Sequence, residues 1–238
     1  MKKQNLKGYD MAQLLKYEDF LERVDNIGFM TLSNVLPGFP SLSDETAEED
    51  WHTGDPETDP WVWKDRVAKE KRAAFGCIIG KHKGFVSADT YSLFYTAFHP
   101  YEHMEERRAS GIISEEVWKL WQIFEEKTLL NTSDIRLEMG VTLKKGGSKI
   151  DRAIEELQQY YYITVAGSRR KIDKYGKEYG WAANVYDKVE NWVPSEWMNL
   201  NTGLSSDEAR EIILDKGMDI SKNVNRRELA KMLGMSYK

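Results

Sequence analysis

The chain has little cysteine and proline, and the scarcity of cysteine excludes two kinds of structural site. Of its 238 residues only Cys77 is a cysteine, and six are proline. One cysteine excludes an intrachain disulfide and a cysteine-rich metal site, which suits a reducing compartment. Phe75, Ile78 and Ile79 flank it in the sequence. We therefore expect a buried, unreactive thiol rather than a nucleophile.

Long apolar runs are also missing. No stretch approaches the ~20 apolar residues of a membrane span, and the N-terminal segment lacks the apolar core of a signal peptide. His82 and His103 have no partners at zinc-ligand spacing. The hydrophobic content of 41% is that of a folded protein. We expect a cytoplasmic protein without membrane contact, metal or cofactor, and its oligomeric state stays open.

The richest pattern lies between Asn131 and Pro194. A short helix from Thr132 ends at Gly140, and Ser148 begins a second helix. The second helix carries an apolar stripe with helical spacing: Ile150, Ala153, Ile154, Leu157 and Tyr161. A strand over 162–166, a glycine-punctuated basic loop over 167–177 and a returning strand over 180–186 follow. With a preceding helix capped by Ser114, this order predicts a winged helix-turn-helix.

Positive charge is concentrated on the same segment. Residues 141–180 hold nine Lys/Arg against five Asp/Glu, although the whole chain has a formal net charge of −5. Such an asymmetry is typical of a surface that contacts phosphates. The candidate DNA-binding residues are Lys144, Lys145, Lys149, Arg152, Arg169, Arg170, Lys171 and Lys174. The alternative is an ordinary solvated loop on a module that contacts only protein.

The remaining segments predict an α+β fold that is mainly helical, with tandem winged helix-turn-helix units and short β-hairpin wings. Residues 1–108 form a loop-rich winged-helix-like region, and within it residues 41–60 carry eight Asp/Glu and no Lys/Arg. Residues 109–194 form the winged helix-turn-helix, and residues 195–238 a helical tail resembling a second helix-turn-helix. Residues 101–108 are highly charged, and we expect them to form a flexible crossing between subdomains.

Several short motifs in a fixed order carry a family resemblance. They are Asp55-Pro56, Trp63 to Arg66, Ala74 to Gly76 and Lys83 to Ser87, followed by the 132–194 unit and the 208–234 tail. In this order the chain resembles the AlkZ-like (YcaQ-type) bacterial proteins, whose characterised members are DNA glycosylases acting on alkylated or crosslinked bases. The resemblance implies a concave, basic surface for double-stranded DNA and chemistry on a flipped or partly exposed nucleotide.

The chain departs from this family at the position of the catalytic motif. In active relatives a Gln-x-Gln or Gln-x-Asp motif stands directly before the Asp-Pro pair and holds the attacking water. Here that position falls on His52, Thr53 and Gly54, so the water-positioning glutamines are missing. The resemblance therefore implies the fold and DNA contact, and leaves a monofunctional DNA glycosylase activity open.

Asp55 and His52 are the candidate catalytic residues. A carboxylate can stabilise an oxocarbenium-like transition state and orient water, while an aspartate before proline also commonly caps a turn. His52 is a candidate proton donor, or a packed side chain beside Trp51. Candidates for stacking on an extruded base are Trp51, Trp61 and Trp63, and the spacing of Trp61 and Trp63 also fits core packing.

We expect a DNA-binding protein that recognises or excises damaged bases by hydrolysis of the N-glycosidic bond. The first alternative is a non-enzymatic winged-helix transcription factor or structural DNA binder. The second is a protein-interaction module that contacts no nucleic acid.

Overall fold

The computed structural model describes residues 13–141 and 147–235. Within these ranges the chain forms eleven α-helices, one short 3-10 helix and two antiparallel three-stranded sheets. The expected α+β class is therefore confirmed. No helix in the described ranges is both long enough and apolar enough to cross a membrane.

The first sheet is built from β1 (Phe29–Thr31), β2 (Ala73–Ile79) and β3 (His82–Ser87), in the order β1-β3-β2. Helices α1 (Tyr17–Ile27) and α2 (Pro60–Lys69) pack beside it. The helix α1 buries one apolar face because Tyr17, Phe20, Leu21 and Val24 recur at helical spacing. Gly28 ends the helix with a φ of 88°, a left-handed conformation in which glycine has no Cβ to clash.

The second sheet has the same strand order. Its strands are β4 (Leu130–Asn131), β5 (Ile163–Ile172) and β6 (Glu178–Lys188), arranged β4-β6-β5. Its helices are α5 (Glu115–Glu126), α6 (Thr132–Glu138) and α7 (Gly147–Gln159). Ser114 accepts a hydrogen bond from Val117 N and so caps α5. The apolar stripe predicted from Ile150 to Tyr161 is buried along its whole length.

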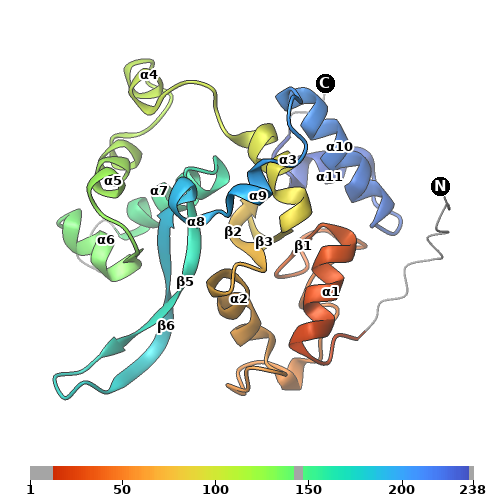
Figure 1. Ribbon diagram of the computed structural model, residues 1–238, viewed down its shortest axis with the longest axis horizontal. Helices are drawn as coiled ribbons and strands as arrows, with labels where there is room; N and C mark the ends of the chain where they lie inside the picture. Colours follow the sequence, from red (N-terminus) through yellow and green to blue (C-terminus); the bar gives the residue numbers. More distant parts are fainter. Residues whose placement is uncertain (1–12, 142–146, 236–238) are drawn as a thin grey trace.

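The hairpin formed by β5 and β6, which we call the wing, is longer than expected. The sequence predicted a short wing with a loop over 167–177, but the strands reach Ile172 and Glu178. The expectation failed because it ended the strand where the apolar residues end. Backbone pairing continues through charged positions, as in the pairs of Lys171 with Tyr179 and Ile172 with Glu178. Figure 1 shows the wing projecting beyond the rest of the molecule.

The remaining helices connect and cover the two sheets. They are the 3-10 helix η1 (Glu48–Asp50), α3 (Ala88–Phe98), α4 (Met104–Ala109), α8 (Val189–Trp192), α9 (Ser195–Met198), α10 (Ser206–Asp219) and α11 (Arg226–Met232). The helix α10 packs against α3. Ser205 caps α10, and Asn225 caps α11.

One expectation about these connections is wrong. Residues 101–108 were expected to be flexible, and the structure instead places α4 over most of that segment. Its acidic first turn and basic last turn oppose the helix dipole favourably, and the Glu106 side chain accepts a hydrogen bond from His103 N.

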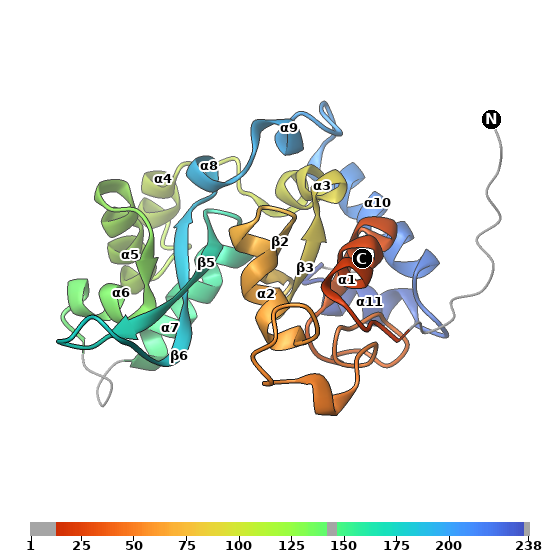
Figure 2. The same ribbon diagram turned by 60° about the horizontal axis from the view of Figure 1, so that its bottom comes forward.

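The two sheets share one continuous core. The helix α7 packs on β2, and α2 packs on β5, so each sheet contacts a helix that belongs to the other. The Tyr161 hydroxyl donates to Ile78 O at 2.9 Å, and the Trp192 indole donates to Ala68 O at 3.2 Å. Figure 2 shows the wing and α2 side by side. These contacts fix the root of the wing relative to α2.

Candidate nucleic-acid interface

A cavity of about 620 Å³ lies between α2 and the wing and is lined by residues of both. One wall is the loop between η1 and α2, including His52, Thr53 and Gly54. The opposite wall comes from the two wing strands and includes Arg170 and Trp181. The floor is the exposed side of α2. The cavity therefore lies between the segment where the resemblance implied catalysis and the hairpin where the charge pattern predicted DNA contact.

The loop wall is held in place by Asp59. This carboxylate is 1% exposed and stands at the N-cap of α2, where it accepts a hydrogen bond from Trp61 N at 2.8 Å. It also accepts from His52 N at 3.0 Å and Gly54 N at 2.8 Å. The helix dipole favours a negative charge at this position. Because three backbone N–H groups converge on Asp59, the loop is fixed to the start of α2.

Aromatic rings line the mouth of the cavity. The His52 ring lies 4.8 Å from the Trp61 ring and 5.7 Å, edge to face, from the Trp181 ring. Trp181 is 75% exposed, although an indole of this size is normally covered. The amine of Lys64 lies 4.2 Å from the centre of the Trp61 ring, a cation–π contact. The arrangement leaves aromatic surface free to stack on a planar ligand.

The three tryptophans predicted to stack on a base have different positions. Trp61 lines the cavity. Trp51 contacts His52, and its indole donates to the Thr46 hydroxyl at 3.0 Å. Trp63 is 0% exposed and stacks on Phe20 in the core, so its surface is not available to a base. For Trp63 the structure corrects the stacking prediction in favour of core packing.

Sequence reasoning missed Trp181. The signal was present, because it is a large aromatic residue in the returning strand of a basic hairpin. Its position beside His52 depends on how the two sheets pack, which no local pattern specifies.

The cations near the cavity fall into two groups. Arg66 is neutralised, since it pairs with Glu57 at 2.7 Å and with Glu70 at 2.8 Å. Lys69 and Arg170 line the cavity and form no ion pair with any residue in the described ranges. Their charge is therefore available to an anionic ligand.

The other predicted DNA-binding residues also divide into those whose side chains have a partner within the protein and those without an ion pair. Lys149 pairs with Glu116 at 2.9 Å, and Arg169 pairs with Asp134 at 2.6 Å. Arg152 donates from Nε to the Ser148 carbonyl. Lys171 and Lys174 lie on the wing without an ion pair to the part of the chain that the structure describes. Lys144 and Lys145 lie outside the described residues.

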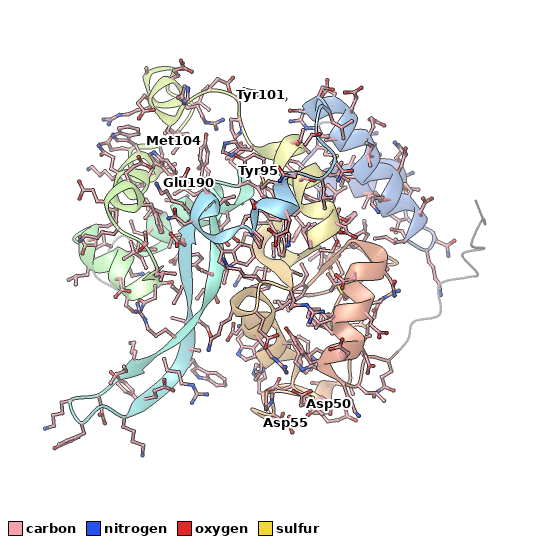
Figure 3. The ribbon with its side chains drawn as sticks, in the orientation of Figure 1. Asp50, Asp55, Tyr95, Tyr101, Met104 and Glu190 are labelled. Atoms are coloured by element: carbon pink, nitrogen blue, oxygen red, sulfur yellow. The ribbon has the colours of Figure 1, made fainter. Side chains whose placement is uncertain are left out.

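Asp55 does not line the cavity. Its Oδ1 accepts a hydrogen bond from Glu57 N at 2.8 Å, which is the turn-capping role expected of an aspartate before proline. Figure 3 shows Asp55 and Asp50 together at the lower edge of the molecule. His52, the other catalytic candidate, does line the cavity, and its ring packs against two indoles.

The carboxylates that do line the cavity are all engaged. Asp59 accepts three N–H groups, and Asp65 pairs with Lys64. Burial opposes ionisation of Glu70, but hydrogen bonds from Arg66 and Tyr17 lower the pKa of its carboxyl below the usual value. A general base for hydrolysis must be able to accept a proton from water. Each of these carboxylates therefore has a structural partner within the protein.

Other parts of the chain offer little chemistry. Cys77 is 4% exposed, and burial raises the pKa of its thiol to about 11, so the group is protonated near neutral pH. The expected unreactive thiol fits this environment. In the described ranges no group of three or more His, Cys, Asp or Glu side chains is placed to hold a metal ion.

Comparison with known proteins gives a family but no individual relative. No curated protein and no solved structure matches the chain. The family described as AlkZ related matches residues 14–234, which is most of the sequence. The chain therefore belongs to the AlkZ-related family.

Proposed function

We propose that this protein binds double-stranded DNA through a winged helix-turn-helix formed by α5, β4, α6, α7, β5 and β6. The order of these elements and the β4-β6-β5 sheet support this winged-helix arrangement. The first sheet follows the same plan with α1, β1, α2, β2 and β3, except that a loop replaces the helix before α2. This repetition supports the tandem arrangement that the sequence suggested.

The observation that carries the proposal is the set of unpaired cations on the wing. Arg170, Lys171 and Lys174 have no ion pair in the described part of the chain. In a protein with a formal net charge of −5, such a local excess is suited to phosphate groups. Membership of the AlkZ-related family supports the same partner.

The cavity beside the wing suits an extruded nucleotide. Its volume of about 620 Å³ falls within the range of small-molecule sites. Trp61, Trp181 and His52 offer stacking surface for a base, and Arg170 lies where a flanking phosphate would pass. A base leaves the stack most easily where it is damaged or mispaired. The function supported best is recognition of distorted duplex DNA.

Binding of distorted DNA can be measured by fluorescence anisotropy. A labelled duplex with a central mismatch should bind more tightly than the matched duplex of the same sequence. Replacement Trp181→Ala should weaken binding to the mismatched duplex by about tenfold, whereas Trp181→Phe should retain most of it. Equal binding to both duplexes by the wild-type protein would contradict base recognition in the cavity.

Excision of the base is the second candidate function, and family membership favours it. In that case Asp55 is the predicted catalytic carboxylate, and its side chain would have to move into the cavity, which it does not line in this structure. A base-release assay on duplexes with alkylated purines separates the two candidates. Recognition alone predicts no release above the buffer control. Release that Asp55→Asn abolishes would establish the enzyme.

A further inference from the structure

The tip of the wing exposes apolar side chains that a free surface normally avoids. Tyr175 is 82% exposed, Ile172 is 62% exposed and Tyr179 is 51% exposed. They are grouped on the part of the hairpin that projects away from both sheets (Figure 1). Lys171 pairs with Tyr179 and Ile172 pairs with Glu178, so Ile172 and Tyr179 lie on opposite faces of the hairpin. Apolar surface exposed on both faces of a projecting tip is typical of a contact surface.

The turn that carries Tyr175 is preorganised. Asp173 Oδ1 accepts hydrogen bonds from Tyr175 N at 2.8 Å and Lys177 N at 2.9 Å. Gly176 adopts a φ of 82°, and its N–H donates to Asp173 O at 3.0 Å. Holding the apex in one conformation reduces the entropy that binding would otherwise cost. The Tyr175 ring is therefore presented on a fixed turn rather than on a loose loop.

Positive charge surrounds the apolar tip. Lys171, Lys174 and Lys177 have no ion pair in the described ranges, and the Lys174 amine lies 4.9 Å from the centre of the Tyr175 ring. Apolar side chains flanked by cations are the composition of elements that enter the minor groove and separate base steps. The cations contact phosphates while the apolar group enters the stack.

The spacing along the wing connects the tip to the cavity. Ile172 follows Arg170 by two positions in β5, which is about 7 Å of strand. Successive base pairs are about 3.4 Å apart, so the tip lies at least about two steps from the nucleotide at Arg170. One duplex can contact both places at once. This favours DNA over an anionic membrane as the occupant of the tip.

We propose that Tyr175 and Ile172 form a wedge that inserts between neighbouring base pairs and unstacks them. The wedge rests on the proposed DNA-binding function and adds a mechanism to it. Unstacking the duplex two or three steps from the bound nucleotide deforms the DNA around it and lowers the cost of moving that nucleotide into the cavity beside Trp181. The cations hold the duplex, and the apolar tip deforms it.

A duplex with 2-aminopurine two or three steps from a central mismatch tests the wedge, because this base fluoresces more strongly when it is unstacked. The wild-type protein should raise the fluorescence on binding. The double variant Ile172→Ala with Tyr175→Ala keeps every lysine. It should lose the rise and bind about tenfold more weakly, with an unchanged salt dependence.

Tyr101→Ala is the matched control, since Tyr101 is 78% exposed and lies far from the wing in Figure 3. It should behave as the wild type does. A full fluorescence rise in the double variant would overturn the wedge and leave DNA binding intact. Absence of DNA binding by the wild-type protein at low salt would overturn the proposed function and the wedge together. A tip variant that loses binding to anionic phosphatidylserine vesicles but not its effect on DNA would also overturn the wedge.

Discussion

The two β-hairpins share a strand order and differ in what covers them. The β2–β3 hairpin has a two-residue turn at Gly80 and Lys81, and all seven residues of β2 are buried. The end of α11 lies against that turn, because a Cβ on Gly80 would be 2.2 Å from Met232 O. The wing has no such cover, and its outer half is exposed and charged. The β2–β3 hairpin is therefore part of the core, whereas the outer half of the wing is exposed and can contact a partner.

The segments that follow the first strand of each sheet, β4 and β1, differ as well. After β4, the helix α6 begins at once at Thr132. After β1, a long loop precedes α2, and residues 41–60 of it carry eight acidic residues. That loop lines the cavity opposite the wing. Of its eight acidic side chains only Asp59 lines the cavity, and that carboxylate is 1% exposed and accepts three backbone N–H groups. The acidic side chains of this loop therefore lie mainly outside the cavity.

The largest predicted effect separates the two hairpin turns. Gly80→Ala places a Cβ against the Met232 carbonyl and forces a φ of 58° on alanine. We expect a loss of about 4 kcal/mol in the free energy of unfolding. Gly176→Ala in the wing turn meets no atom within 4 Å and should lose only about 1 kcal/mol. Urea unfolding measures both losses. Equal values would show that the first turn is not packed as described.

The next prediction compares the helix caps. Asp59 is buried and receives three backbone N–H groups, whereas Asn131 at the start of α6 receives those of Ser133 and Asp134. Asp59→Ala should cost about 2–3 kcal/mol, because it removes the acceptor of three backbone N–H groups at once. Asn131→Ala should cost about 1 kcal/mol. A smaller loss at Asp59 than at Asn131, in urea unfolding, would contradict its role in fixing the loop.

The smallest predicted effect on stability concerns two short connections between a helix and a strand, one from α2 to β2 and the other from α7 to β5. Lys71 and Tyr161 occupy corresponding places, with φ values of 53° and 57°. Only the second junction contacts a histidine, since His99 Nδ1 lies 2.9 Å from Tyr160 O. Burial lowers the pKa of His99 below its usual 6.5. The unfolded chain therefore takes up a proton first as the pH falls, and the stability that His99 contributes is full above about pH 6.5 and lost below it.

Replacing His99 with glutamine should flatten the decline in stability as the pH falls below about 6.5. Unfolding midpoints in urea at several pH values provide the measurement. An unchanged pH dependence would show that His99 is not held neutral by the junction.

Local sequence patterns predicted much of the fold. The predicted features include the buried stripe from Ile150 to Tyr161, the cap at Ser114 and the buried Cys77, which follow from helical spacing and side-chain chemistry. They could be predicted because each depends on residues within a few turns of the chain. The length of the wing could not, since charged strands pair through their backbones.

Single residues of the candidate site were predicted from the sequence, but their arrangement around one cavity was not. His52, Trp61 and Arg170 were each identified from local features, but their meeting around one cavity depends on α2 packing on β5. Trp181 was missed for the same reason. Trp63 was assigned to base stacking although helical spacing also allowed the core, and only burial separates the two outcomes.

The most direct test is the salt dependence of DNA affinity for two triple variants. One replaces the unpaired wing cations Arg170, Lys171 and Lys174 with alanine, and the other replaces Lys149, Arg152 and Arg169, whose side chains already have partners. Each phosphate contact contributes about 0.9 to the slope of log K against log salt. We predict that the wing variant lowers the magnitude of this slope by about 2–3 and the other variant by less than about 1. Equal losses, or a larger loss in the second variant, would contradict the wing as the DNA-binding surface.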